Sequence, residues 1–176
     1  NETLWPVFHY MSTYANYDKT YWDYYVQVNE KFKQEVLPLL APGDTLWIHD
    51  YQLLLLPSLI RREMEHVAIG FFLHIPFPSF ELFRLIPWRS ELLSGMLGAD
   101  VIGFHTHDDV MHFVHTIDRL LPAERSSRQI FYNDHSSMVD AFPMGIDFEK
   151  FEKLLNDRDV LNSLAQLQMN FQGLEI

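Results

Sequence analysis

Apolar and aromatic side chains recur every three or four positions over residues 20–40, and this spacing predicts a long amphipathic helix. Thr20 followed three positions later by Asp23 matches a capping-box pattern, which is typical of a helix start. The Pro42-Gly43-Asp44 segment interrupts helical structure, so we expect the helix to end before it.

Short apolar runs separate further helical patterns along the rest of the chain. Residues 67–74 form a continuous apolar run, which predicts a central parallel strand buried on both faces. Other runs predict strands over 45–49, 100–104, 129–132 and 137–142. Helical spacing predicts helices over 53–65, 79–84, 88–97, 106–121, 147–155 and 160–171, with Ser79, and Thr106 with Asp109, as candidate caps.

The alternation of strands and helices predicts an α/β fold, a Rossmann-like parallel sheet flanked by helices. Connections in such sheets are right-handed, and ligands bind in the crevice beyond the carboxyl ends of the strands. In this chain three polar clusters follow predicted strands and would therefore lie in the crevice, at residues 49–52, 74–78 and 104–106.

Composition narrows the choice of partners. The net charge of −11 argues against nucleic-acid and anionic membrane surfaces, because both are bound by clustered Lys and Arg. The chain has no cysteine, which excludes disulfides and fits a cytoplasmic protein. Residues 67–80 are apolar but too short and too interrupted to span a bilayer. Neither end has the pattern of a natural terminus, and we expect a piece of a longer protein without a signal peptide.

Two residues at the predicted strand ends carry candidate chemistry. The Asp50 carboxylate can accept hydrogen bonds from two sugar hydroxyls; its alternative role is to cap the helix that follows. The His74 imidazole can donate to a sugar hydroxyl or carry a proton; its alternative is a buried histidine satisfied by a backbone carbonyl.

A group of histidines and aspartates over residues 105–115 could suggest a metal site, but the spacing of these residues does not support one. It matches no zinc motif, and we expect a solvated helix start without metal; its members are His105, His107, Asp108, Asp109, His112 and His115. No Ser-His-Asp grouping, Walker loop or GxGxxG motif is present in the sequence, so a glycine-rich phosphate cradle is absent as well.

Several segments together resemble the trehalose-6-phosphate synthase family of retaining glycosyltransferases. The resemblance runs over residues 4–151, and the segment 69–78 is its most specific part. The matching segments are Leu4-Trp-Pro-Val-Phe-His-Tyr10, Trp22-x-x-Tyr25-x-x-Val28-Asn29, Trp47-Ile-His-Asp-Tyr51, Ile69-Gly-Phe-Phe-Leu-His-Ile-Pro-Phe-Pro78, Leu97-Gly-Ala-Asp-Val-Ile-Gly-Phe-His-Thr106 and Phe142-Pro-Met-Gly-Ile-Asp147.

The resemblance implies a two-domain GT-B glycosyltransferase. Its reaction would transfer glucose from UDP-glucose to glucose 6-phosphate with retention, and it would need no metal and no cofactor. Residues 1–155 would form part of the acceptor-side domain, and residues 156–176 would be a helical segment leading toward an absent nucleotide-sugar domain. The isolated chain is therefore expected to be inactive.

The resemblance also assigns roles to single residues. Tyr10 matches a tyrosine that contacts the acceptor, and Asp50 matches the aspartate that binds acceptor hydroxyls. His74 matches the histidine that faces the reacting sugars, and Ile75 lies beside it in the substrate site. We therefore expect Asp50 and His74 to be catalytic. Gln52 departs from the family pattern, which usually has a histidine after the Asp-Tyr pair.

Three other interpretations stay open. A related enzyme, such as a pseudo-glycosyltransferase that couples cyclitols, would share the fold and differ in acceptor. A non-catalytic synthase-like module would serve regulation or assembly, and a generic α/β domain would use these motifs only for structure. We also expect apolar surface to be exposed where missing segments would cover it, which leaves a homo-oligomer open.

Overall fold

The computed structural model describes residues 2–171, which fall into two compact units that divide after Pro143. The first unit contains a six-stranded sheet and its helices, and the second contains two helices. The predicted domain boundary after residue 155 lies inside the second unit. As a boundary in the complete protein it stays a prediction.

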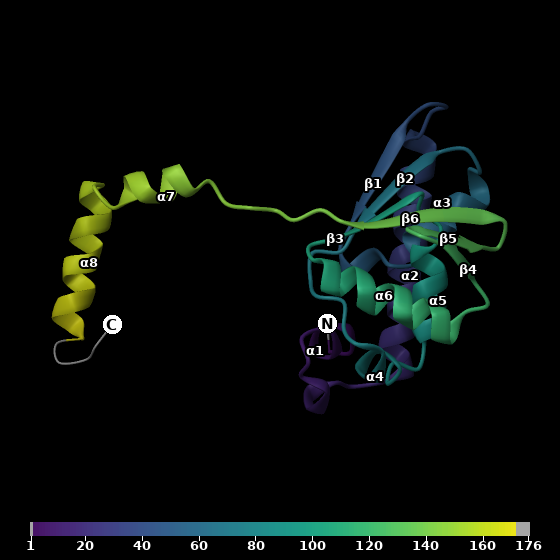
Figure 1. Cartoon of the computed structure of the whole chain (residues 1–176), viewed down its shortest axis with the longest axis horizontal. Helices are drawn as coiled ribbons and strands as arrows, with labels where there is room; N and C mark the ends of the chain where they lie inside the picture. Colours follow the sequence, from purple (N-terminus) through teal and green to yellow (C-terminus); the bar gives the residue numbers. More distant parts are fainter. Residues whose placement is uncertain (1, 172–176) are drawn as a thin grey trace. The chain divides into compact units, whose positions relative to one another are not determined.

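The sheet combines parallel and antiparallel strands (Figure 1). Across the sheet the order is β1 (Thr45–His49), β2 (Ala68–Phe72), β3 (Val101–Phe104), β6 (His135–Ala141), β5 (Gln129–Tyr132) and β4 (Glu124–Ser126). The first four are parallel to one another, as predicted, and β5 and β4 are antiparallel to their neighbours. The prediction of a wholly parallel sheet is therefore wrong at this edge.

A tight hairpin explains the antiparallel edge. Asn133 and Asp134, between β5 and β6, have φ of 50° and 60°. Two such residues in the left-handed region make a two-residue turn whose twist suits a hairpin. Strand β4 was not predicted at all, because its three residues are exposed and polar and so give no apolar signal.

The predicted helices are present with adjusted ends. The α-helices are α1 (Leu4–Phe8), α2 (Lys19–Val36), α3 (Leu56–Glu63), α4 (Phe80–Phe83), α5 (Arg89–Met96), α6 (His107–Leu120), α7 (Phe148–Leu154) and α8 (Arg158–Asn170). Short 3₁₀ helices cover Ser12–Tyr14, Leu37–Leu39 and Tyr51–Leu53. Helix α1 and the first and third 3₁₀ helices were not predicted, since segments this short carry little periodicity.

The caps agree with the sequence at one helix and differ at two. The Thr106 hydroxyl accepts a hydrogen bond from the Asp109 amide at the start of α6, as predicted. Helix α2 is capped by Asp18, whose carboxylate accepts from the Thr20 amide at 2.7 Å, and not by Thr20 itself. Ser79 precedes α4 but makes no side-chain cap bond.

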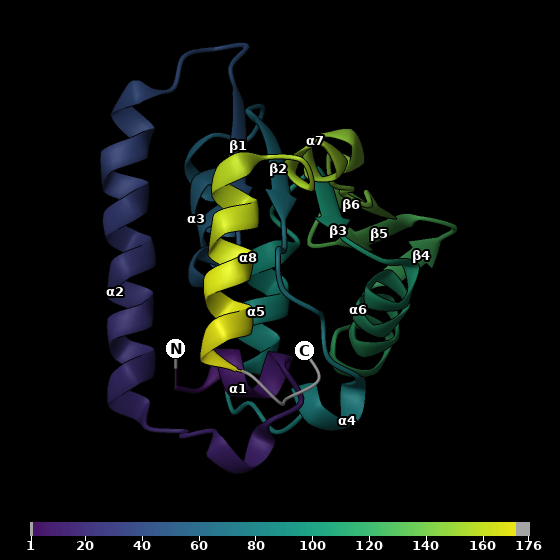
Figure 2. The same ribbon diagram turned by 90° about the vertical axis from the view of Figure 1, so that its left-hand side faces the viewer.

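The core lies on one face of the sheet. Helices α3, α5 and α6 lie on one face of the sheet (Figure 2). Buried strand side chains, among them Ile48, Phe71 and Phe104, belong to the core on this face. Two glycines let α5 and its end approach the chain at the start of α3. A Cβ on Gly95 would lie 2.4 Å from the Leu54 carbonyl oxygen, and one on Gly98 would lie 2.3 Å from the Ser58 amide nitrogen.

The other face of the sheet, here called the open face, is only partly covered within the first unit. Trp47 of β1 is 66% exposed, Ala68 and His74 are exposed, and Met138 of β6 is 39% exposed. The prediction that 67–74 is buried on both faces is therefore wrong for Ala68 and His74. The exposed side chains of Trp47 and Met138 give this face the exposed apolar surface that the sequence analysis expects.

The second unit consists of α7 and α8, each begun by an aspartate cap. The Asp147 carboxylate accepts from the Lys150 amide, and the Asp157 carboxylate accepts from the amides of Asp159 and Val160. Both helices occur where the sequence predicted them. Over residues 2–171 no helix has the length and apolar character that crossing a membrane requires.

Candidate functional site at the carboxyl ends of the strands

Asp50 directly follows β1 and has a strained backbone. Its φ of 71° and ψ of 170° lie in a region that side chains rarely adopt. The carboxylate accepts from the Tyr51 amide at 2.9 Å and from the more distant His74 amide at 3.4 Å. The capping role that the sequence left open is thus present, and the carboxylate also joins two neighbouring strand ends.

His74 lies two residues beyond β2 with its side chain exposed. Its Nε2 is 2.9 Å from Nδ1 of His49, the last residue of β1. The alternative of a buried histidine satisfied by a backbone carbonyl is therefore wrong. The structure brings His74 and Asp50 together at adjoining strand ends, as the crevice rule predicted.

Rings line the open face beside these residues. Trp47 packs on His49 at a centroid distance of 4.7 Å, and the Phe72 ring lies 4.8 Å from His74. His105, after β3, has its ring 5.8 Å from that of His74. Gly103 makes room for this row, because a Cβ there would lie 2.7 Å from a carbon of the Phe72 ring.

Side chains of helix α2 hold the turn after Asp50 through hydrogen bonds to its backbone. The Tyr25 hydroxyl donates to the Tyr51 carbonyl at 2.7 Å and accepts from the Leu54 amide at 3.0 Å. The Asn29 side-chain amide donates to the Gln52 carbonyl at 3.0 Å. Burial raises the pKa of Tyr25 well above its usual range, so this hydroxyl keeps its proton.

The loop after His74 is held by α6 and by Tyr10. The Asp109 carboxylate accepts from the Phe77 amide at 2.9 Å, and His112 Nδ1 lies 3.2 Å from the Phe77 carbonyl. The Tyr10 hydroxyl accepts from the Ser79 amide at 3.1 Å. Two members of the polar cluster considered for metal thus serve the backbone, and among the described residues no group of three or more ligands is arranged to hold a metal.

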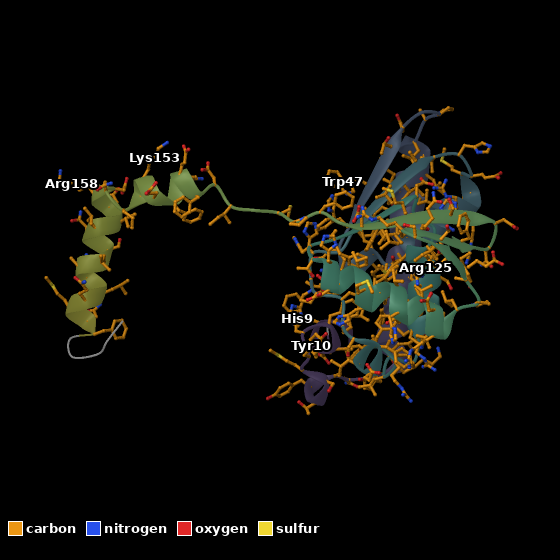
Figure 3. The ribbon with its side chains drawn as sticks, in the orientation of Figure 1. His9, Tyr10, Trp47, Arg125, Lys153 and Arg158 are labelled. Atoms are coloured by element: carbon orange, nitrogen blue, oxygen red, sulfur yellow. The ribbon has the colours of Figure 1, made fainter. Side chains whose placement is uncertain are left out.

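The remaining predicted site residues lie around the same loop. Tyr10 is 53% exposed and lies just after α1, beside His9 (Figure 3). Ile75 follows His74 directly, and its side chain is 7% exposed and belongs to the core. Substrate contacts of Tyr10 and Ile75 stay predictions.

Sequence reasoning passed over Trp5 as a site residue. Its ring is stacked 4.0 Å from His9 and lies 5.7 Å from Tyr51, the neighbour of Asp50, and the residue is 45% exposed. An exposed indole is uncommon enough to have drawn attention to it within the Leu4–Tyr10 segment.

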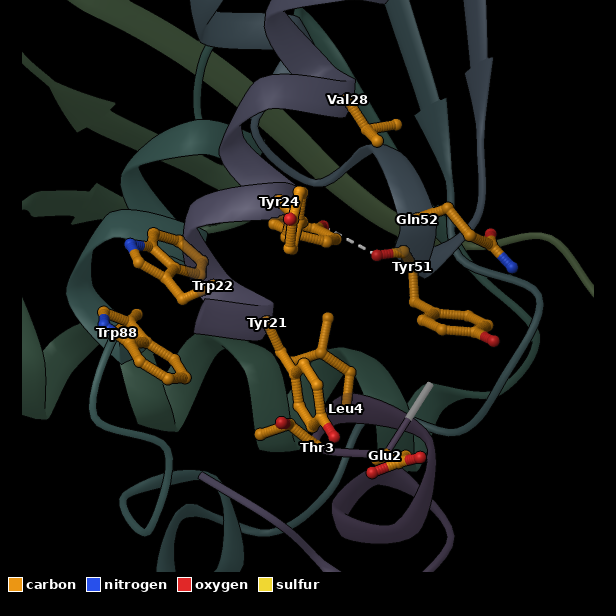
Figure 4. Close-up of a pocket in the computed structure, with 11 residues that line it drawn as sticks. Glu2, Thr3, Leu4, Tyr21, Trp22, Tyr24, Val28, Tyr51, Gln52 and Trp88 are labelled. Atoms are coloured by element: carbon orange, nitrogen blue, oxygen red, sulfur yellow. Dashed lines mark hydrogen bonds between the residues drawn. The ribbon is translucent and has the colours of Figure 1, made fainter. Parts of the chain in front are cut away.

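A cavity of about 420 Å³ lies next to the Asp50 turn, between the start of α1, α2 and the 3₁₀ helix Tyr51–Leu53 (Figure 4). Its walls are largely aromatic and include Tyr21, Trp22, Tyr24, Tyr25, Tyr51 and Trp88. Trp22 stacks in parallel on Trp88 at 5.0 Å and is partly buried against the core, so its ring has a packing role.

The whole chain, residues 1–176, matches the profile of glycosyltransferase family 20. The chain belongs to this family. A UDP-forming α,α-trehalose-phosphate synthase of Pichia angusta is 43% identical over 97% of the chain, which spans 37% of that protein.

Solved structures give the same assignment. A UDP-forming α,α-trehalose-phosphate synthase of Burkholderia xenovorans in complex with glucose-6-phosphate superposes with a TM-score of 0.84 and 30% identity, over 96% of this chain and 39% of that one. The N-terminal domain of Candida albicans trehalose-6-phosphate phosphatase superposes with a TM-score of 0.83 and 40% identity, over 97% of this chain and 37% of that one. The predicted family and the GT-B fold class are confirmed, and the chain spans about two fifths of the length of these relatives.

Proposed function

We propose that this chain, within a complete protein, forms part of the acceptor side of a UDP-forming trehalose-phosphate synthase. One observation carries the proposal: Asp50 and His74, on neighbouring strand ends, are joined by the hydrogen bond from the His74 amide to the Asp50 carboxylate. In open α/β sheets this edge is where ligands bind. The substrates would be UDP-glucose and glucose 6-phosphate.

The polar groups at the edge suit a sugar acceptor. The Asp50 carboxylate can accept from sugar hydroxyls, because two backbone amides use only part of its capacity. The exposed His74 ring can donate to a hydroxyl or carry a proton. The exposed Trp5 indole offers an apolar surface for a sugar ring, and Tyr10 and Ile75 complete the proposed contacts.

We propose no cofactor and no metal for the reaction. Glycosyl transfer exchanges one C–O bond for another without net oxidation, so it needs no redox group. The leaving diphosphate would be stabilised by cationic side chains and a helix N-terminus of a second domain. The isolated chain would therefore show no turnover; turnover by the chain alone would contradict this part of the proposal.

The test uses the gene extended at both ends to a two-domain protein. UDP release from UDP-glucose is measured with and without glucose 6-phosphate, for the parent, Asp50→Asn and Asp50→Ala. Asparagine tolerates positive φ and keeps an acceptor oxygen for the Tyr51 amide, so Asp50→Asn removes the charge while keeping the cap. We expect a loss of about 10- to 100-fold in acceptor-dependent release, which is what a hydrogen bond to a charged group contributes.

Asp134→Asn is the matched control. Asp134 also has a positive φ, at 60°, and lies exposed in the β5–β6 turn, before the amino end of β6. It should leave UDP release unchanged. Release that does not depend on glucose 6-phosphate, or that survives in Asp50→Asn, would reject the proposed acceptor or the proposed role of Asp50.

A second candidate function rests on the likeness to the N-terminal domain of a trehalose-6-phosphate phosphatase. A chain of this fold can thus be part of a protein named for another activity, which supports a synthase-like module without transfer activity. The same assay separates the two candidates. The module predicts no UDP release by the extended parent at any concentration of glucose 6-phosphate.

A further inference from the structure

His49 and His74 make a side-chain contact that the proposed chemistry leaves unused. Nδ1 of His49 and Nε2 of His74 are 2.9 Å apart, within hydrogen-bond distance, and the two rings stack at a centroid distance of 5.1 Å with an interplanar angle of 28°. Both side chains are exposed on the open face. On the side of His74 the bond uses Nε2, the ring nitrogen farther from the backbone.

The strand register explains why the two rings meet. His49 pairs with Phe72 in the parallel β1–β2 ladder, and His74 follows two residues after Phe72, just beyond β2. The ring of Trp47 packs against His49, and the ring of Phe72 packs against His74. The register of β1 and β2 thus brings the two histidines close to each other.

A hydrogen bond between two neutral imidazoles needs one N–H and one bare nitrogen. Each neutral ring carries a single proton, on either Nδ1 or Nε2. If His49 carries its proton on Nδ1, His74 must keep Nε2 bare and protonate Nδ1. If His74 carries its proton on Nε2, Nδ1 of His49 must be bare. The bond thus couples the tautomers of the two rings.

We propose that His49 is a positioning residue for His74, fixing the orientation of its imidazole and coupling its tautomer to that of His49. The proposal rests on the proposed function, in which His74 faces the reacting sugars. A ring whose Nε2 is held by His49 presents its other nitrogen, Nδ1, to a hydroxyl in one orientation, whereas a free ring rotates about its side-chain bonds. The hydrogen-bonding nitrogen is then already in place when the substrate arrives.

The first test reads the tautomer in the chain itself. Nitrogen-15 NMR of the histidine rings at about pH 8.5, where histidine side chains are neutral, distinguishes protonated from bare nitrogens. The parent should show matched tautomers: the fraction of rings protonated on Nδ1 should be the same for His49 and His74. His49→Phe keeps a ring between Trp47 and His74 but has no nitrogen, so the signal of His74 Nε2 should move to that of a nitrogen without this partner. His49→Asn places an amide near the position of Nδ1, which can accept from His74 Nε2 or donate to it, and should return the signal toward that of the parent.

His66→Asn is the matched control, since His66 is exposed in the turn before β2, away from the rings of His49 and His74. It should leave the His74 signals unchanged. Protonated fractions that differ between His49 and His74 in the parent, or a His74 Nε2 signal that is unchanged in His49→Phe, would overturn the proposal. A spectrum of an unfolded chain is recognised by the loss of dispersion at all histidines, and His49→Asn then decides the question.

The second test measures UDP release by the extended protein. His49→Phe should lower kcat by about tenfold, the loss expected for one hydrogen bond of about 1.4 kcal/mol, with KM for glucose 6-phosphate changed less. His49→Asn should stay within about threefold of the parent. Equal kcat in His49→Phe and parent would overturn the role. An inactive parent would reject the proposed function alone, because the NMR result still decides whether His49 positions His74.

Discussion

The Tyr25 hydroxyl lies 2.7 Å from the carbonyl oxygen of Tyr51 and donates to it. The oxygen of the Tyr25 hydroxyl also accepts a hydrogen bond from the Leu54 amide, so one side chain of α2 closes both ends of the 3₁₀ helix that follows Asp50. Asp50 itself is held in a strained conformation. Its position at the strand end therefore depends on a residue that need not touch substrate.

Tyr25→Phe should destabilise the chain by about 1–3 kcal/mol, the cost of leaving buried backbone groups without a partner. Urea unfolding followed by circular dichroism measures the change. Tyr24→Phe is the matched control, since Tyr24 is the neighbouring residue and is 62% exposed; it should change stability by less than about 0.5 kcal/mol. Equal effects of the two substitutions would show that the clamp contributes little.

The raised pKa of Tyr25 gives stability a dependence on alkaline pH. Up to a pH of about 10 the hydroxyl is protonated in the folded and the unfolded chain. Above it only the unfolded chain loses the proton, so the free energy of unfolding falls by up to about 1.4 kcal/mol per pH unit for this group. Burial raises the pKa of Tyr51 and Tyr17 as well, so some slope remains without Tyr25.

Tyr25→Phe should therefore reduce the loss of stability between about pH 10 and pH 11.5, because it removes one of the groups responsible. Urea midpoints at several pH values give both slopes. The difference in stability between parent and variant should shrink as the pH rises. A difference that stays constant across this window would contradict the assignment of the slope to Tyr25.

Asp50 combines a backbone role and a proposed chemical role, and two substitutions separate them. Asp50→Ala removes the carboxylate and leaves an alanine at φ 71° and ψ 170°, a conformation that costs non-glycine residues about 1–3 kcal/mol. Asp50→Gly removes the carboxylate and accepts this backbone without strain. We expect Asp50→Gly to be more stable than Asp50→Ala by about 1 kcal/mol, while both lose acceptor-dependent UDP release in the extended protein. If Asp50→Gly retained acceptor-dependent UDP release, the carboxylate would have no chemical role, and Asp50 would serve only the backbone.

The meeting of Asp50 and His74 could be predicted because it follows from a general rule. Both residues come directly after apolar runs, and parallel strands bring their carboxyl ends to one edge. The roles of Tyr25 and Asn29 could not be predicted, since helical periodicity does not say which turn of α2 meets the chain after Asp50. The contact of His49 with His74 was missed for a similar reason: it depends on the β1–β2 register, which the apolar pattern leaves undetermined.

Errors in the fold have the same origin in missing long-range information. The buried run at 67–74 reads as a two-sided core strand, yet one of its faces is open in the first unit, because that face depends on what packs against it. Strand β5 was predicted as part of a parallel sheet although its short pattern carries no information on direction, and β4 gave no pattern at all. The Asn133-Asp134 pair was the one local signal for the hairpin, since such residues favour left-handed turns.

Arg61 offers a prediction at the opposite end of the sheet. Its guanidinium donates through Nε to the Gly98 carbonyl and through one terminal nitrogen to the carbonyls of Glu65 and Val67. The other terminal nitrogen pairs with the Asp100 carboxylate at 2.7 Å, and that oxygen also accepts from the Ile69 amide. One planar side chain thus joins α3, the turn before β2 and the start of β3.

Arg61→Lys should cost about 1–3 kcal/mol in urea unfolding, because an ammonium group cannot reach these divergent acceptors together. Arg62→Lys is the control, since Arg62 is the next residue and is exposed. The network lies at the amino ends of the strands, away from Asp50 and His74. UDP release per folded molecule of the extended protein should therefore stay at the parent level in Arg61→Lys. A lowered kcat with unchanged stability would instead connect this end of the sheet to the reaction.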